Sequence, residues 1–503
     1  AMPTLVVRAD ASVAMGTGHV MRCMSLGQAW QDAGGDVLFL TAQSGPAVEA
    51  RLRSENMGVI PLSAAVGGED DAAATIEIAR SKGAAWVVVD GYQFDVEYQR
   101  HLKDGGSKVL LVDDSARATD CEADIVLNQN AFARPEFYRS VPGTRLLLGA
   151  RYTLLRREFR CSRPFDRQVP ALATKLLLTM GGSDPDNVTR RILDSLASLE
   201  SDSWETTVIV GGNNPYSESL RDAAGKSGRN IRLLSDVKNM SEWMKWADVA
   251  VTAAGSTCWE MCFLGLPALL IDLAPNQVPI AEELARAGAA VHLGGTKNVT
   301  AERIAAELQA LRQSPERRAA MSARGRQLVD GEGAQRVVCA MQGASVCVRR
   351  AAAADSRLLW EWVNDPGVRA ASFSTQPIAW PEHQAWFARK MTDPNTLWLI
   401  GEDDEGRPIG QFRVDWHSAA DGNIGVSVAP GARGSGYGRQ LIEQSVRRVF
   451  NTTPTERMHA FIRQENQASI RSFERVGFSR VGEEQVQGCP ALHYVLMRGN
   501  TKD

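Results

Sequence analysis

Short apolar runs alternate with longer amphipathic stretches along the first two thirds of the chain. The apolar runs have the length of strands and occupy residues 4–8, 37–41, 86–90, 108–113 and 125–127. The stretches between them have helical periodicity, and several end at glycine pairs such as Gly34-Gly35. This alternation predicts a parallel sheet with helices on both faces.

A polar stretch at residues 156–170 interrupts the alternation, which then restarts. Its second part has apolar runs at residues 175–179, 207–210, 249–252 and 268–272, and a long helical stretch at residues 301–342 closes it. The sequence thus predicts two doubly wound α/β halves, residues 3–165 and 166–343, each opening with a strand, a glycine turn and a helix. A nucleotide-sized ligand is expected in the cleft between two such halves.

The pattern changes after the small residues Gly343, Ala344 and Ser345. Two helical stretches lie at residues 353–364 and 381–391. They are followed by strand patterns at residues 396–402, 410–415 and 423–429. Residues 346–503 are therefore predicted to form a separate α+β domain.

Composition limits the function classes. The net charge of −3 over 503 residues gives no global basic field that would favour nucleic acid or anionic membranes as partners. The longest apolar stretches have the length of strands, and no basic segment with a long apolar core opens the sequence, so we expect a cytoplasmic location. The eight cysteines lack metal-ligand spacing; we expect reduced thiols and no bound metal.

A lone histidine follows the first glycine turn, Gly16-Thr17-Gly18-His19. A third glycine is missing and no acid ends the strand at residues 37–41, so a dinucleotide site is disfavoured. His19 lies at the start of a helix, where the helix dipole disfavours imidazolium, and a neutral imidazole is the natural base for activating water near pH 7. The alternative is a histidine that only packs or caps at a helix start.

Six segments considered together resemble the UDP-sugar hydrolases of pseudaminic acid biosynthesis, which are relatives of the glycosyltransferase that makes lipid II. They are "RADASVAMGTGHVMRC", "VVDGYQF", "DDSARATDCEADIVLNQN", "LLGARYTLLRREF", "MGGSDPDNVT" and "AAGSTCWEMCFLGLPALLIDLAPNQ". The resemblance implies a GT-B fold and metal-free cleavage of the anomeric C–O bond of a UDP-linked diacetamido-trideoxy-altrose, which releases UDP and the free sugar.

The same resemblance assigns roles in the N-terminal half and at the first turn of the second half. The catalytic histidine of the family falls on His19, and Tyr92 matches an active-site tyrosine, although a half-buried aromatic at a strand end explains Tyr92 equally well. Substrate contacts are implied at Gly16, Gly18, Gly182 and Ser183; as a plain turn, residues 181–185 would use Ser183 or Asp184 as helix caps.

The second half is expected to hold the nucleotide. Ser256 and Thr257 open a helix whose free N–H groups would face a diphosphate. Glu260 resembles the acid that binds the uridine ribose, whereas residues 257–260 also form a capping-box pattern. Asn276 and Gln277 resemble a polar pair near the sugar and phosphates, or they are plain helix caps.

A glycine loop in the third domain, Arg433-Gly434-Ser435-Gly436-Tyr437-Gly438, places successive N–H groups at a helix start, which suits a pyrophosphate. Together with "ENQASIRSFERVGF" at residues 465–478, it resembles the GNAT superfamily of N-acetyltransferases. The resemblance implies acetyl-CoA as cosubstrate, bound by this loop (Arg433, Gly434, Gly436, Tyr437 and Gly438), by a splayed strand at Val426 and Val428, and by Asn466 and Phe473.

One position departs from that family. Phe473 stands where many members carry a tyrosine that protonates the CoA thiolate, so Tyr494 or water would have to act instead, or the thiolate leaves unassisted. His383 is a candidate base, and His417 and Asp415 are weaker ones. The segments "WEWVNDPGVR" and "WPEHQAWF" resemble the amino-sugar acetyltransferase of the same pathway and are expected to form the acceptor site, although the tryptophans also suit a core.

The sequence therefore predicts a bifunctional enzyme. The third domain acetylates the 4-amino group of a UDP-linked 4-amino-4,6-dideoxy sugar, and the GT-B halves hydrolyse the product, with no nucleic acid or membrane partner. Two alternatives remain open at this point: a GT-B glycosyltransferase with an unrelated acetyltransferase tail, and a UDP-sugar or acetyl-CoA sensor with an inactive tail.

Overall fold

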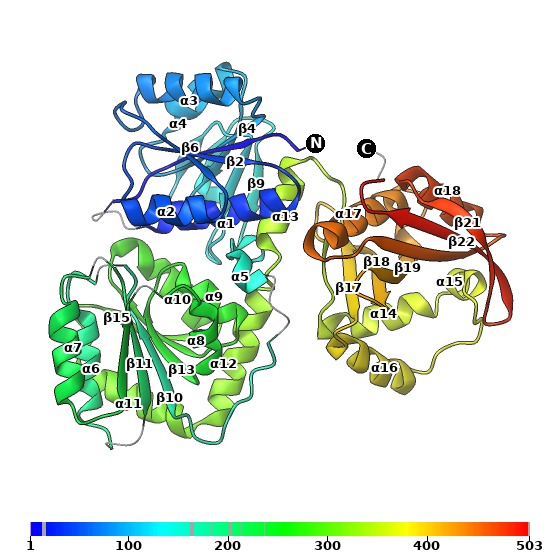
Figure 1. Cartoon of the computed structure of the whole chain (residues 1–503). Coiled ribbons are helices and arrows are strands. Elements are labelled where there is room, and N and C mark those ends of the chain that lie inside the picture. Colours follow the sequence, from blue (N-terminus) through cyan, green and yellow to red (C-terminus); the bar gives the residue numbers. More distant parts are fainter. Residues whose placement is uncertain are drawn as a thin grey trace. The chain divides into compact units, whose positions relative to one another are not determined.

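The computed structural model describes residues 2–12, 17–160, 165–182, 184–200, 204–212, 214–235 and 237–500. The chain divides into two compact units, Ala1–Val337 and Val338–Asp503 (Figure 1). The first unit contains two large sheets and the second unit contains one.

The first sheet is parallel, with the strand order β3-β2-β1-β4-β5-β7-β9. Its strands are β1 (Leu5–Ala9), β2 (Val37–Thr41), β3 (Gly58–Pro61), β4 (Trp86–Asp90), β5 (Lys108–Val112), β7 (Ile125–Asn128) and β9 (Arg145–Leu148). The helices and short elements around it are α1 (Gly18–Asp32), α2 (Pro46–Ser54), α3 (Glu69–Ser81), α4 (Val96–Asp104), α5 (Arg157–Arg160), η1 (Pro135–Phe137), η2 (Ala150–Tyr152), and the small sheet of β6 (Thr119–Cys121) and β8 (Tyr138–Ser140). Every residue of β1, β2 and β4 is buried, as covering both faces of a parallel sheet requires.

The position of β1 in this order decides where the first site forms. β1 pairs with both β2 and β4. Strands β2 and β3 follow on one side of β1 and the later strands on the other, so the order in which strands are added to the sheet reverses at β1. Ligands of such sheets bind beyond the carboxyl ends of the strands at this switch point. The carboxyl ends of β1 and β4 lie side by side, because Ala9 is paired with Asp90.

The second sheet is also parallel, in the order β12-β11-β10-β13-β14-β15. Its strands are β10 (Lys175–Thr179), β11 (Glu205–Val210), β12 (Ile231–Ser235), β13 (Val249–Ala253), β14 (Ala268–Asp272) and β15 (Ala290–Gly295). One face packs on α6 (Val188–Leu196), α7 (Ser217–Lys226) and α11 (Ala301–Gln313), and the other on α8 (Met240–Trp246), α9 (Thr257–Phe263) and α10 (Val278–Arg286), with η3 (Pro275–Gln277) before α10 (Figure 1). Both predicted doubly wound halves are thus present.

The helical stretch predicted at residues 301–342 consists of three helices. α11 is followed by α12 (Pro315–Leu328) and α13 (Gly333–Met341). Pro315 starts α12 because proline suits the first helical turn. Gly331, with φ of +83°, precedes α13.

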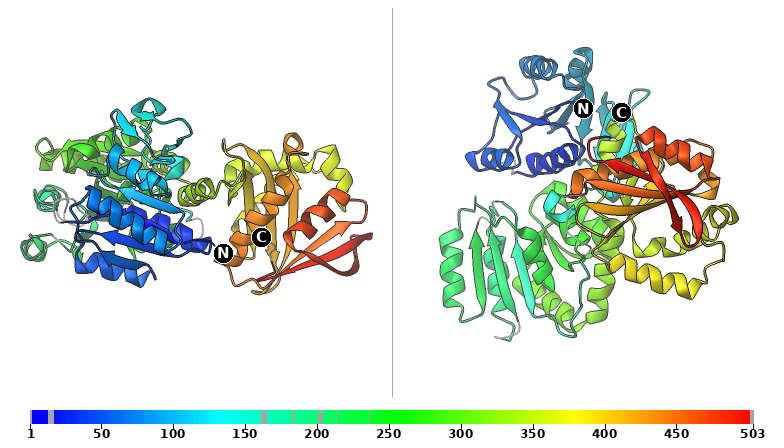
Figure 2. Two further views of the ribbon diagram at one scale, coloured as in Figure 1. Left: turned by 90° about the horizontal axis from the view of Figure 1, so that it is seen from above. Right: turned by 45° about the vertical axis from the view of Figure 1, so that its right-hand side comes forward.

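The third sheet is mixed, with the order β16-β17-β18-β19-β20-β22-β21. Its strands are β16 (Cys347–Arg350), β17 (Thr396–Glu402), β18 (Pro408–Trp416), β19 (Asp421–Val428), β20 (Arg457–Arg463), β21 (Ser479–Val486) and β22 (Cys489–Met497). α17 (Tyr437–Thr452) and α18 (Gln467–Val476) cover one face; α14 (Ser356–Val363) and α16 (Trp380–Thr392) pack on the other (Figures 1 and 2). The remaining helical elements of this unit are η4 (Ala353–Asp355), α15 (Pro366–Ala371) and η5 (Pro430–Ala432).

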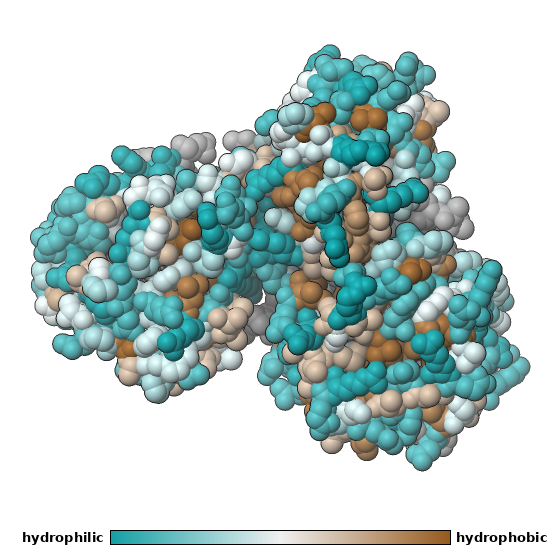
Figure 3. Space-filling model, turned by 180° about the vertical axis from the view of Figure 1, so that it is seen from behind, coloured by the Kyte–Doolittle hydropathy of each residue, from teal (hydrophilic) through white to brown (hydrophobic). Residues whose placement is uncertain are grey.

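The surface is mainly hydrophilic on the face shown in Figure 3. The large hydrophobic side chains exposed among the described residues are Tyr92, Leu172, Val481 and Met497. No helix in the described part of the chain is long and apolar enough to cross a membrane. Cys23, Cys121, Cys258, Cys262 and Cys489 are free thiols.

Candidate functional site

His19 lies in the first turn of α1, directly beyond the carboxyl end of β1, and is 8% exposed. Its Nδ1 lies 2.5 Å from Oδ1 of Asp90, the last residue of β4. An ionised carboxylate only accepts hydrogen bonds, so the neutral ring carries its hydrogen on Nδ1 and keeps the lone pair on Nε2. The ring is therefore oriented as a proton acceptor, and its neighbours are polar.

Asp90 is held ionised by the residues around it. The Nε–H and Nη2–H groups of Arg22 donate to its two oxygens at 2.6 and 2.7 Å. Burial of Asp90 acts to raise the pKa of its carboxyl, but the charges and hydrogen bonds of Arg22 and His19 outweigh burial and lower the pKa to about 2.

Tyr92 and Asp114 complete this group. The hydroxyl of Tyr92 donates to Oδ1 of Asp114 at 2.9 Å, and Nη1 of Arg22 donates to Oδ2 of the same carboxylate at 3.0 Å. The Tyr92 ring meets the His19 ring edge-on, with centroids 5.6 Å apart. Desolvation and the Asp114 carboxylate raise the pKa of Tyr92, so its hydroxyl keeps its proton. Tyr92 is 59% exposed, which leaves its ring open to a ligand.

Sequence reasoning did not single out Asp90, Arg22 or Asp114. A signal for Asp90 was present, because the acid ends an apolar strand that neighbours the first strand in a parallel sheet. Arg22 had a weaker signal: it lies three residues after His19 and thus on the same side of one helix. Gly18 is the first residue of α1, whereas Gly16 lies outside the described residues.

In the second half, Glu260 faces Arg156 of the segment that precedes α5. The Nε–H and Nη2–H groups of Arg156 donate to the two Glu260 oxygens at 2.8 and 2.9 Å. The N-cap of α9 is Ser256, and no side-chain hydrogen bond caps this helix, so the capping-box alternative is not formed. A carboxylate accepts about four hydrogen bonds. Glu260 thus keeps capacity for ribose hydroxyls, and Arg156 fixes its orientation.

The other residues predicted for the nucleotide lie on the loops after β10, β13 and β14. Oε1 of Gln277 accepts the N–H of Leu273 at 2.9 Å, and Asn276 is exposed. Thr257 starts α9. Gly182 is exposed after the β10 strand, and Ser183 lies outside the described residues. Asp184 is one of the two predicted caps: its carboxylate accepts the N–H groups of Val188 and Thr189.

In the second unit, the predicted glycine loop precedes the long helix α17. Gly434 and Gly436 have φ of +80° and +79°, and no atom lies within 4 Å of the position that a Cβ would take at either glycine. Arg433 is held by Asp365, whose Oδ1 accepts from its Nη2 at 2.7 Å. Tyr437 is the first residue of α17, and a Cβ at Gly438 would touch Val428. The loop therefore presents open backbone at a helix start, as a pyrophosphate requires.

The strand beside this loop is splayed as predicted. β19 and β20 pair in parallel only at Asp421↔Arg457, Gly422↔Met458 and Asn423↔His459, although β19 continues to Val428. The backbone of β19 at Val426 and Val428 is thus paired with β18 alone. Asn466 caps α18, because its Oδ1 accepts the N–H of Ser469 at 3.1 Å.

Of the predicted acid–base candidates of this unit, Tyr494 and His383 are buried, whereas Asp415 is partly buried and His417 is exposed. Phe473 packs edge-on against Phe478 in the core. Tyr494 is 2% exposed in the same core, and its hydroxyl donates to Glu474 at 2.9 Å. Burial and this hydrogen bond raise the pKa of Tyr494.

His383 lies among aromatic side chains on the other face of the sheet. It is 2% exposed, stacks with Trp380 and Phe387, and contacts the carbonyl of Ser356 through Nε2. Burial lowers the pKa of His383. The predicted acceptor segments thus form an aromatic cluster, in which Arg357 stacks on Trp360 and Trp380.

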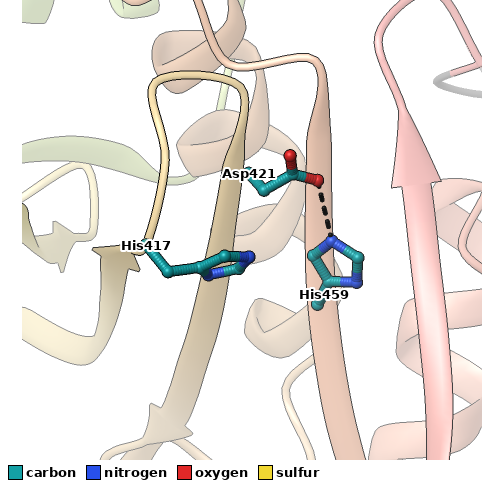
Figure 4. A group of neighbouring side chains, drawn as sticks. All are labelled: His417, Asp421 and His459. Carbon is teal, nitrogen blue, oxygen red and sulfur yellow. Dashed lines mark hydrogen bonds and ion pairs between the residues drawn. The ribbon is translucent and has the colours of Figure 1, made fainter.

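The sequence analysis did not predict that two histidines and an aspartate of the second unit lie together. His417, Asp421 and His459 place one potential ligand atom each within 4.8 Å of one another (Figure 4). Both oxygens of Asp421 already accept hydrogen bonds from Arg457, at 2.5 and 2.9 Å, so a fixed positive charge occupies the carboxylate. This group is better suited to hold a proton than a metal ion.

Comparisons with known proteins agree with this division. Residues 176–337 match the glycosyltransferase family 28 C-terminal domain, and residues 345–479 match the acetyltransferase (GNAT) domain. The UDP-2,4-diacetamido-2,4,6-trideoxy-beta-L-altropyranose hydrolase of Campylobacter jejuni is 26% identical over 287 residues, which cover 56% of this chain and 97% of that protein.

Two further comparisons concern the order of the domains and the fold. An uncharacterised protein of Methanocaldococcus jannaschii is 22% identical over 500 residues, 95% of this chain and 96% of its own. The crystal structure of Acinetobacter baumannii MurG covers 68% of this chain and 100% of its own, with 17% identity and a TM-score of 0.51, and confirms the GT-B fold. The chain is thus a two-enzyme protein, in which a GT-B unit with a glycosyltransferase family 28 C-terminal domain precedes a GNAT acetyltransferase domain.

Proposed function

We propose that the GT-B unit hydrolyses a UDP-linked 2,4-diacetamido-2,4,6-trideoxy-L-altrose, with His19 as the base that activates water. The 2.5 Å contact between His19 Nδ1 and Asp90 carries this proposal, because it leaves Nε2 as the acceptor. The hydrolase of C. jejuni, matched over 97% of its length, supports the substrate class.

In this reaction a water oxygen attacks the anomeric carbon while His19 Nε2 takes a proton from the water. The C–O bond to the β-phosphate breaks, and its electron pair stays with UDP. Asp90 stabilises the imidazolium that forms, and the proton leaves for solvent when the free sugar departs. Ser256 and Thr257 would hold the diphosphate and Glu260 the ribose.

The GNAT domain is proposed to make the substrate of this hydrolysis. It would acetylate the 4-amino group of UDP-4-amino-4,6-dideoxy-N-acetyl-altrosamine with acetyl-CoA, held at the loop around Gly434 and Gly436. The relative in M. jannaschii supports a functional link, since its match spans both units in one chain. The proposal places both steps in the cytoplasm, in pseudaminic acid biosynthesis.

Mass spectrometry of the full chain incubated with this 4-amino sugar nucleotide and acetyl-CoA tests both steps. We expect the acetylated UDP-sugar first, followed by UDP and the free diacetamido sugar. A glycosyltransferase would release no free sugar into water, and a sensor would leave both substrates unchanged; either result would refute the proposal. The variant His19→Ala should accumulate the acetylated UDP-sugar and still bind UDP.

A further inference from the structure

Arg22 of α1 bridges two carboxylates at the carboxyl edge of the first sheet. Its Nε–H and Nη2–H groups donate to the two oxygens of Asp90 at 2.6 and 2.7 Å, and its Nη1–H group donates to Oδ2 of Asp114 at 3.0 Å. His19 contacts the opposite end of this network, since its Nδ1 lies 2.5 Å from Asp90. His19, Asp90, Arg22 and Asp114 are called here the charge group, because each of them carries or gains a charge in the proposed hydrolysis.

Two further titratable side chains face the charge group, and both stay uncharged. Sγ of Cys23 donates to Oδ2 of Asp90 at 3.4 Å, and burial raises the pKa of this thiol. The hydroxyl of Tyr92 donates to Oδ1 of Asp114 at 2.9 Å, and desolvation and that carboxylate raise the pKa of the hydroxyl. Within these contacts, the charges that face His19 are therefore those of the other three members of the group.

A separate network of charges lies on the other side of β1. Asp10 accepts from Nη1 of Arg8 at 2.8 Å and from the backbone N–H groups of Ala42 and Gln43, which follow β2. The rest of the Arg8 guanidinium is bound to Asp71 of α3. These contacts direct Asp10 towards β2, whereas the charge group forms between α1, the end of β4 and the loop after β5.

The charge group is shielded from water. None of its four side chains is more than 14% exposed, and that of Asp90 is fully buried. Charges in such a place interact more strongly and are screened less by salt than charges on the surface. The net charge of the group therefore affects how readily His19 accepts a proton.

Counting charges shows what Arg22 and Asp114 each contribute. Asp90 is ionised, because its neighbours lower its pKa to about 2, and the two carboxylates raise the pKa of Arg22, which stays protonated. With neutral His19, two carboxylates and one guanidinium leave one net negative charge. Once His19 has accepted a proton, the group is neutral. Without Asp114 the protonated group would carry a net positive charge, and without Arg22 the unprotonated group would carry two negative charges.

We propose that Arg22 and Asp114 are positioning residues of the hydrolysis, which together set the basicity of His19. Arg22 holds Asp90 in place and offsets its charge, so that the buried carboxylate does not keep a proton on His19 before water is attacked. Asp114 supplies the negative charge that makes the group neutral when His19 takes the proton of water. This inference rests on the proposed hydrolysis and adds to it how the base is tuned.

The test follows kcat for UDP release against pH in the full chain, at saturating UDP-diacetamido sugar. Protonation of His19 removes the base, so kcat falls on the acid side of its plateau. In Asp114→Asn the imidazolium loses a favourable charge; this acid limb should move to lower pH by about half a unit or more, and the plateau should fall about threefold because the base is weaker. In Arg22→Gln the limb should move to higher pH by about one unit or more.

The double variant Arg22→Gln/Asp114→Asn should have its acid limb between those of the single variants, because it loses one charge of each sign. Asp120→Asn and Arg139→Gln are the matched controls. They make the same substitutions in an exposed ion pair and should leave the limb where the wild type has it. Thermal melts of all variants separate a lost fold from a changed base.

Opposite shifts in Asp114→Asn and Arg22→Gln support the inference, since a purely structural role moves neither limb. Unmoved limbs, or shifts in the same direction, overturn it. A wild-type chain that releases no UDP would refute the proposed function instead. NMR titration of labelled histidines then tests the charge count without turnover, with the His19 signal assigned by its loss in His19→Ala. Its midpoint should fall in Asp114→Asn and rise in Arg22→Gln, and equal midpoints would overturn the inference.

Discussion

His19 and Asp90 are 71 positions apart in the sequence and meet at 2.5 Å because α1 begins and β4 ends at the same edge of one sheet. The pairing of β1 with β4 fixes this meeting, and Arg22 binds the other side of the Asp90 carboxylate. The proposed base and the carboxylate that orients it are thus both positioned by the parallel sheet, which is more rigid than a loop.

Replacing Asp90 by asparagine should abolish the orientation of His19. An amide presents either N–H or C=O to Nδ1, so the ring loses the hydrogen bond that keeps its lone pair on Nε2. We expect kcat for UDP release to fall by 100-fold or more, with UDP affinity within threefold of the wild type. Kinetics at saturating UDP-sugar and calorimetric UDP binding check this. Near-normal turnover in Asp90→Asn would contradict the proposed role.

The lowered pKa of Asp90 predicts a defined acid dependence of stability. A carboxylate whose pKa is about 2 in the folded chain and 3.8 unfolded stabilises the fold above pH 3.8 and loses this contribution as the pH falls towards 2. The contribution is about 2 kcal/mol, by the conversion of 1.36 kcal/mol per pKa unit.

Urea unfolding of the full chain and of Asp90→Asn between pH 5 and pH 2 measures this dependence. The difference in stability between the two proteins should shrink by about 2 kcal/mol across that interval. Asp120→Asn is the control, because Asp120 pairs with Arg139 on the surface and should show little change. A constant difference between wild type and Asp90→Asn would show that Asp90 is not held ionised.

An element of the fold was predictable from the sequence where the residues of that element themselves carry the pattern. β2, β4, β10, β14 and β17 were predicted with their observed bounds, because apolar runs between turns report burial directly. The two doubly wound halves and the α+β tail were confirmed for the same reason. β12 was missed, since its burial is partial and its sequence, "IRLLS", lacks a long apolar run.

The partners of the site residues were less predictable than the residues themselves. His19 and Glu260 carry local signals, a glycine turn and a helix start. Their partners Asp90 and Arg156 are 71 and 104 positions away in the sequence. The sheet order brings Asp90 to His19, whereas Arg156 reaches Glu260 from the segment that precedes α5.

Glu260→Gln tests the ribose role. A hydrogen bond to a charged group contributes about 1.5–3 kcal/mol, so the wild type should bind UDP more tightly than 2′-deoxy-UDP by about 10-fold or more. The variant should bind the two nucleotides almost equally, and calorimetry on the full chain compares all four affinities. Glu242→Gln, on the exposed side of α8, is the control and should discriminate between the two nucleotides as the wild type does. Asp184→Asn is unsuitable because Asp184 caps α6. Retained discrimination in Glu260→Gln would exclude the ribose contact.

Gly436→Ala tests the loop before α17. A non-glycine residue at φ of +79° costs about 1 kcal/mol, and the change in backbone would turn N–H groups away from a bound pyrophosphate. We expect the affinity for acetyl-CoA to fall at least 10-fold while UDP release from the diacetamido sugar nucleotide is unchanged, because the two activities belong to separate units.

Gly431→Ala is the matched control for this change. Its φ is ordinary and a Cβ there also meets open space, so both activities should stay within twofold of the wild type. Calorimetry with CoA and a thermal melt separate lost binding from lost stability. If Gly436→Ala bound CoA as the wild type does, the pyrophosphate would have to lie elsewhere, and the open backbone at Gly434 and Gly436 would be only a turn.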